Sequence, residues 1–166
     1  MKSSRRSKDT RSISRIYEGL VGLTKTEELY AYAERQGYPV IEPPPDGTID
    51  SMAMLSPRGT PCIFFRPEGY TEAEQNERLC HEIGHCEEGA FYTVLSAPTA
   101  REKCEEQARR WSYRKLIPLS ALLSAFSDGE TEAWQIAERL SVPERMVREA
   151  AEYYRAAFSS VFCSTP

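Results

Sequence analysis

Histidine is scarce in this chain, with only two among its 166 residues. Long apolar runs are missing as well, since none approaches the ~20 residues of a membrane span. The first 20 residues are basic and serine-rich, without the apolar core of a signal peptide. The net charge of −4 gives no overall attraction to nucleic acid or to anionic membranes. These absences predict a cytoplasmic protein that does not enter a membrane and does not bind nucleic acid directly.

Cysteine is present, but not in the pattern of a secreted disulfide scaffold. The five cysteines are odd in number and lack the close spacing of such a scaffold. Reduced thiols in a cytosolic protein are therefore expected. Cys80 and Cys86 flank both histidines, and Cys62 lies upstream of them.

Both histidines lie in the stretch CHEIGHC at residues 80–86. A spacing of four places His81 and His85 on one face of a helix, so that both imidazoles can reach one point. Glu82 follows the first histidine. The pattern His-Glu-x-x-His is typical of a zinc hydrolase, in which neutral imidazoles bind the metal and the glutamate is the general base. We therefore predict Zn²⁺ as the cofactor, His81 and His85 as ligands, and Glu82 as the catalytic residue.

A third protein ligand is expected, because a catalytic zinc site usually has three and keeps one position open. With no third histidine, the choice falls on a carboxylate or a thiolate. Of the glutamates on the next helix, Glu105 shares a stripe with Ala108, which is small enough to let two helices approach closely. Glu105 is therefore the preferred third ligand. A deformylase-type site, with Cys62 as the ligand instead, remains the alternative.

Capping signals and hydrophobic periodicity predict the helices and strands. Thr24 with Glu27 and Thr71 with Glu74 form capping boxes, which open helices that end near Gly37 and Gly89. Three short apolar stretches are expected to form a small antiparallel sheet, and the remaining helices follow the histidine motif. The expected strands cover residues 38–42, 49–55 and 62–65, and the later helices cover 100–117, 121–126, 131–140 and 141–158, with Ser141 and Glu144 as a third capping box.

Two separated motifs together resemble a known family. HEIGHCEEGAFY at 81–92, followed by EEQARRWSYRKLIP at 105–118, is similar to the paired signature of ImmA/IrrE-type zinc metalloendopeptidases, HExxH and then ExxAxxFAxxLLxP. The resemblance implies an α+β, zincin-like fold, with a small antiparallel sheet packed on the active-site helix. It also implies metal ligation by His81, His85 and Glu105, and catalysis by Glu82. Members typically act on a helix-turn-helix repressor, so a regulatory protein substrate is expected.

The expected organisation has three parts. Residues 1–20 form a flexible basic tail, residues 21–126 a zincin-like metallopeptidase domain, and residues 127–166 a helical pair packed on that domain. This pair could also be read as a DNA-binding helix-turn-helix. However, its second helix carries as many glutamates as arginines, three of each, and so offers no net positive charge to a phosphate backbone. Packing through Trp134, Ile136, Met146 and their apolar neighbours is therefore the favoured interpretation.

Three features leave the mechanism open. Arg109 stands where the family commonly has Asp or Asn, and an arginine cannot accept a hydrogen bond from a ligand histidine. A catalytically weak zinc-binding module, which antagonises a repressor without cutting it, is therefore the alternative function. Tyr92 or Tyr113 could stabilise an oxyanion, but packing is the favoured interpretation of each, and the oxyanion role is not assigned. The strand at 62–65 is either an edge for a substrate peptide or a buried central strand.

Overall fold

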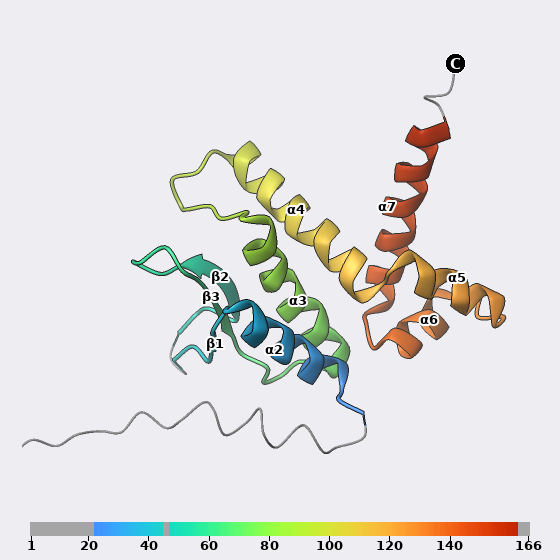
Figure 1. Cartoon of the computed structure of the whole chain (residues 1–166), viewed down its shortest axis with the longest axis horizontal. Helices are drawn as coiled ribbons and strands as arrows, with labels where there is room; N and C mark the ends of the chain where they lie inside the picture. The colour runs from blue at the N-terminus through green and yellow to red at the C-terminus, as the bar shows by residue number, and fades with distance from the viewer. Residues whose placement is uncertain (1–21, 45–46, 163–166) are drawn as a thin grey trace, which may run out of the picture.

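The computed structural model describes residues 22–44 and 47–162 and has the expected α+β architecture. The predicted basic tail and Cys163 lie outside the described residues. Figure 1 shows the sheet at one end of a pair of long helices, α3 and α4, and the C-terminal helices α5, α6 and α7 at the other end. The elements in chain order are α2 (Lys25–Gln36), β1 (Val40–Ile41), β2 (Ser51–Leu55), β3 (Pro61–Phe65), α3 (Glu72–Glu88), α4 (Pro98–Leu116), α5 (Leu119–Ser127), α6 (Ala133–Leu140) and α7 (Glu144–Phe162).

Local signals at the helix ends are confirmed for α2 and α3. Thr24 and Thr71 each accept a hydrogen bond from the backbone three residues later, and the glutamate there bonds back to the cap. Gly89 ends α3 in the left-handed conformation, with φ of 60°, which glycine adopts without steric cost. The histidine motif thus occupies the last turns of a helix whose two ends are set by adjacent residues.

The sheet has the strand order β1-β3-β2, and it is mixed rather than antiparallel. β2 runs antiparallel to β3, as expected, but β1 runs parallel to β3. The chain crosses the sheet between β1 and β2, so β1 lies on the far side of β3 instead of forming a meander. The apolar strand at 62–65 is consequently the central strand, and the outer edge of β2 is free of further strands within the part of the chain that the structure describes.

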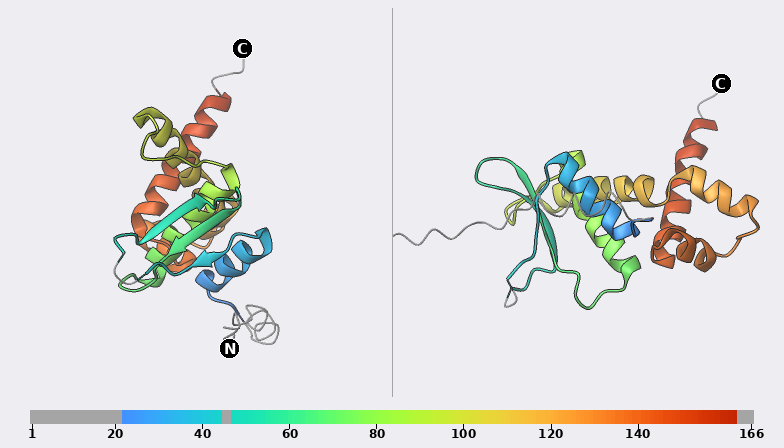
Figure 2. Two further views of the ribbon diagram at one scale, coloured as in Figure 1. Left: turned by 90° about the vertical axis from the view of Figure 1, so that its left-hand side faces the viewer. Right: turned by 60° about the horizontal axis from the view of Figure 1, so that its bottom comes forward.

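Side chains from the sheet and from both long helices form one core. Ile63 and Phe65 from β3 are buried together with Leu79 and Ile83 from α3. In Figure 2, the strands lie across α3, which separates them from the C-terminal helices. Buried residues of α5, α6 and α7 belong to the same hydrophobic cluster.

The C-terminal helices pack largely as expected, with two corrections. Ile136 and Met146 are buried in the core, but Trp134 is 55% exposed and does not anchor the pair. Ser141 is not an N-cap, because α7 begins at Glu144 and Ser141 ends α6 in the left-handed conformation, with φ of 52°. None of the described helices has both the length and the apolarity needed to cross a membrane.

A buried asparagine ties three parts of the fold together. Asn76 on α3 is fully buried, and its oxygen accepts a hydrogen bond of 2.7 Å from the Thr26 hydroxyl on α2. Its amide nitrogen donates a bond of 2.8 Å to the carbonyl of Ser141, at the turn between α6 and α7. The start of α3 is therefore held to both neighbours by polar contacts within the core.

Candidate metal centre

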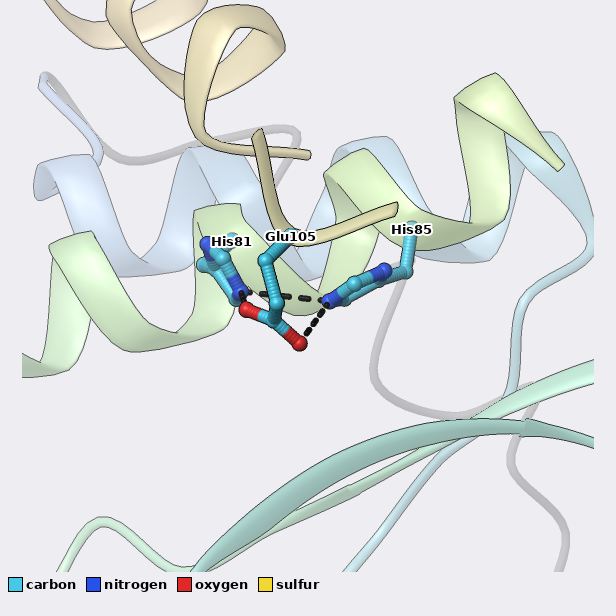
Figure 3. A group of neighbouring side chains, drawn as sticks. All are labelled: His81, His85 and Glu105. Atoms are coloured by element: carbon cyan, nitrogen blue, oxygen red, sulfur yellow. Dashed lines mark hydrogen bonds and ion pairs between the residues drawn. The ribbon is translucent and has the colours of Figure 1, made fainter. Parts of the chain in front are cut away.

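The two histidines of α3 and one glutamate of α4 point toward a common position (Figure 3). His81 Nε2 lies 3.0 Å from Glu105 Oε2, and His85 Nε2 lies 3.5 Å from Glu105 Oε1. The two Nε2 atoms are 3.2 Å apart. The three residues expected to be ligands are therefore close enough to hold one metal ion.

Close contact between α3 and α4 brings these side chains together. At Gly84, an added Cβ would lie only 2.7 Å from the carbonyl oxygen of Ala108. Ala108 is fully buried at this contact, in agreement with the role expected from its small size. The need for glycine at position 84, inside the histidine motif, is visible only once the two helices are packed. A larger residue at this position would push the Glu105 backbone away from the histidines.

The donor set fits a zinc ion. Ligand atoms 2.0–2.2 Å from a tetrahedral zinc ion are about 3.3–3.6 Å apart, close to the spacings seen here. His85 Nδ1 lies 2.8 Å from the carbonyl oxygen of Ala90, which only accepts hydrogen bonds, so this nitrogen carries the proton. The Nε2 atom, on the other side of the ring, faces His81 and Glu105. A divalent cation at this position could be coordinated by one atom from each of His81, His85 and Glu105.

The ligand carboxylate has its own orienting partner. The hydroxyl of Tyr92 donates a hydrogen bond of 2.5 Å to Glu105 Oε1. This bond is the main reason why the pKa of Tyr92 rises to about 12, so the phenol stays protonated and remains a donor. Burial would raise the pKa of Glu105, but the Tyr92 bond and the nearby imidazoles outweigh it and lower the pKa. Glu105 is therefore held as a carboxylate. Contacts of this kind orient metal ligands in many proteins.

The pKa shifts suit a cation site beside a proton acceptor. Burial, reinforced by the neighbouring His85, lowers the pKa of His81 and favours the neutral ring that a metal needs. Glu82 is only 7% exposed, and burial raises the pKa of its carboxyl. One of its oxygens accepts a hydrogen bond of 2.6 Å from the backbone N–H of Ala53 in β2. Sequence patterns carry no signal for this contact between strand and helix.

The site opens onto a cleft of about 1380 Å³. Its walls are β2, the metal-site face of α3, the loop at 90–96, α4 and the inner face of α7. Tyr92 lies in this loop, beside Glu105. Tyr113, the other aromatic considered for an oxyanion role, donates instead to Glu149 on α7, at 2.9 Å. The lining reaches beyond the three candidate ligands, to Leu55 in β2 and to Tyr153 in α7.

Other candidate ligands are engaged elsewhere. Cys62 is buried, and its thiol contacts the carbonyl of Met54 at 3.6 Å, outside the ligand group found among the described residues. Burial raises the pKa values of Cys80 and Cys86 to about 12, so both thiols stay protonated. Glu106 binds two arginines of its own helix. The geometry therefore favours Glu105 over a cysteine ligand.

Arg109 lies one turn beyond Glu105, where its side chain pairs with Glu106 at 2.7 Å. Its positive charge is one of the smaller influences that lower the pKa of His81. An arginine has no acceptor, so it does not orient this histidine as an Asp or Asn could.

Comparison with known families agrees with this site. Residues 33–152 match the Peptidase M78 model, described as an IrrE N-terminal-like domain. The match covers more than half of the chain and includes the sheet, α3, α4 and the C-terminal helical pair up to the middle of α7. The fold and the possible metal site agree with a peptidase, and the chain belongs to the IrrE N-terminal-like family of peptidases. Neither the curated proteins nor the solved structures give a significant match.

Proposed function

We propose that the protein is a zinc-dependent metalloendopeptidase that hydrolyses a peptide bond in a regulatory protein. The observation that carries this proposal is the convergence of His81, His85 and Glu105 next to a buried glutamate, Glu82, in an open cleft. Membership of a peptidase family supports the reaction class.

The residues divide the chemistry between them. A zinc ion held by His81, His85 and Glu105 would polarise a peptide carbonyl and lower the pKa of water from 15.7 towards ~7. Glu82 accepts a proton from the attacking water on a carboxylate oxygen and delivers it to the leaving nitrogen. Burial raises the pKa of Glu82, which makes its carboxylate a better proton acceptor at neutral pH. Tyr92 holds Glu105 in place.

An extended peptide is the substrate form that suits the cleft. β2 borders the cleft, and its outer edge pairs with no other strand among residues 22–44 and 47–162. A peptide can add to such an edge through main-chain hydrogen bonds, which recognise any sequence. Because β3 is the central strand, the strand at 62–65 has no open edge for a substrate peptide, and β2 is the proposed binding edge instead.

A helix-turn-helix repressor is the proposed substrate, and the resemblance of the two sequence motifs to ImmA/IrrE-type enzymes supports this choice. The test is incubation of the purified protein with the repressor encoded nearest its gene, with zinc or with a chelator, followed by mass spectrometry. A single cut that requires both zinc and Glu82 is expected. Glu82→Gln is the matched control, because it keeps the side-chain shape but cannot take up the proton.

The second candidate function is capture of the repressor without cleavage. Arg109 favours it, because the position lacks an acceptor that could orient His81. Under this alternative, wild type and Glu82→Gln bind the repressor equally and neither cuts it. An intact repressor in the presence of stoichiometric zinc would overturn the peptidase proposal for this substrate.

A further inference from the structure

We infer that the backbone N–H of Ala53 positions Glu82 for catalysis, so that the free edge of β2 is part of the proton-transfer apparatus as well as a border of the cleft. This inference rests on the proposed peptidase function. It assigns a role to a main-chain group at a position where the side chain carries no chemistry.

The register of the sheet shows which way this N–H points. Residues of an antiparallel pair alternate between those that exchange hydrogen bonds with the partner strand and those that point away from it. The N–H of Ser56 bonds to Thr60 and the N–H of Arg66 bonds to Asp50, so the even-numbered residues of β2 pair with β3. Ala53 is odd-numbered, so both its N–H and its carbonyl point to the free edge.

Glu82 satisfies this outward N–H. Its Oε2 lies 2.6 Å from the nitrogen of Ala53, at the short end of N–H···O bonds, and charged acceptors shorten such bonds. A glutamate side chain has three rotatable bonds. The Ser51 side chain, on the same strand, also hydrogen-bonds this carboxyl and partly offsets the rise of its pKa caused by burial. Anchoring the carboxylate on β2 through the Ala53 N–H restricts its rotation and holds it at the border of the cleft. The strand and the active-site helix are thereby joined at the catalytic residue itself.

Proline at position 53 isolates this contact. Ala53→Pro removes the N–H but leaves the ladder between β2 and β3 intact, since that N–H takes no part in it. Ala53→Val is the matched control, because it adds similar bulk, suits a strand and keeps the N–H. Comparing the two variants therefore separates the hydrogen bond from packing at the same position.

The kinetic test uses zinc-loaded protein and a peptide that the wild type cuts, selected from an internally quenched peptide library. Ala53→Pro is expected to lower kcat about 10- to 100-fold relative to Ala53→Val, because small displacements of a catalytic group have effects of this size. KM and zinc affinity should stay within about twofold, since neither depends on this N–H. Equal kcat values for the two variants, with both folded, would refute the inference and leave the peptidase function standing.

Amide hydrogen exchange tests the same bond without activity. In the wild type, the Ala53 amide should exchange more slowly than the outward-facing amide of Leu55 at the same edge. Glu82→Ala should remove this protection, while the amide of Met54, which faces β3, remains protected. Unchanged exchange at Ala53 would overturn the inference even if Ala53→Pro fails to fold. Absence of any cleavage by the wild type would instead refute the proposed function, and with it the catalytic role of the bond.

Discussion

Gly84→Ala is the substitution with the most specific consequence for the metal centre. The new Cβ would lie 2.7 Å from the carbonyl oxygen of Ala108, whereas ordinary contact begins at 3.4 Å. The helices must therefore separate by about 0.7 Å, the difference between these distances. Metal–ligand distances tolerate only about 0.2 Å, so Glu105 should leave the coordination sphere or bind in a strained position. We expect zinc affinity to fall at least about tenfold.

Stability should change much less than zinc binding. Replacing glycine by alanine within a helix favours folding by about 1 kcal/mol, whereas overpacking costs about 1–3 kcal/mol, so a net loss of about 0–2 kcal/mol is expected. Competition with a chromophoric chelator measures zinc affinity, and urea unfolding of the metal-free protein measures stability. The double variant with Ala108→Gly should not recover zinc binding, because the obstructing atom belongs to the backbone. Zinc affinity within twofold of wild type would refute the reasoning.

Three further predictions use the same two assays. Tyr92→Phe loses the hydrogen bond to the Glu105 carboxylate and should weaken zinc binding about tenfold without unfolding the protein. Unchanged zinc affinity would mean that this hydrogen bond does not orient the ligand. Asn76→Ala loses both buried hydrogen bonds and should reduce the free energy of unfolding by about 2–3 kcal/mol. A loss below about 0.5 kcal/mol would mean that these two hydrogen bonds contribute little to stability. Burial lowers the pKa of His81 below its usual 6.5, so protons should compete with zinc for this ligand only at lower pH. The zinc affinity should therefore stay constant above pH 6.5 and decline below it. A decline that begins above pH 6.5 would contradict the lowered pKa of His81.

Arg109 offers a separate test of the departure from the family pattern. Its charge lies near enough to lower the pKa of His81, so it should also oppose a cation at the site. Arg109→Asn is expected to raise zinc affinity about two- to fivefold, as suits a partly exposed charge in solvent. Glu106→Gln is the companion variant, because it frees the arginine from its partner and should lower zinc affinity slightly. Equal affinities for both variants would mean that this charge does not act on the site.

The residues of the candidate metal centre could be identified largely from local patterns. The spacing of His81 and His85 is meaningful because helix geometry places residues four apart on one face. Capping boxes at Thr24 and Thr71 set the start of two helices through contacts within a single turn. Glu105 could be chosen over its neighbours from the position of Ala108, which shows which face of α4 can approach another helix.

What the sequence by itself determined was therefore the helices and the chemistry of their side chains. Tertiary structure alone decided the order of the strands, because pairing across a sheet joins residues far apart in the chain and either side of β3 could have received β1. It also decided that Gly84 is the point of closest approach, that Ser141 ends α6 instead of capping α7, and that the N–H of Ala53 meets Glu82. Each of these depends on how separate elements pack against one another, and no local pattern encodes that.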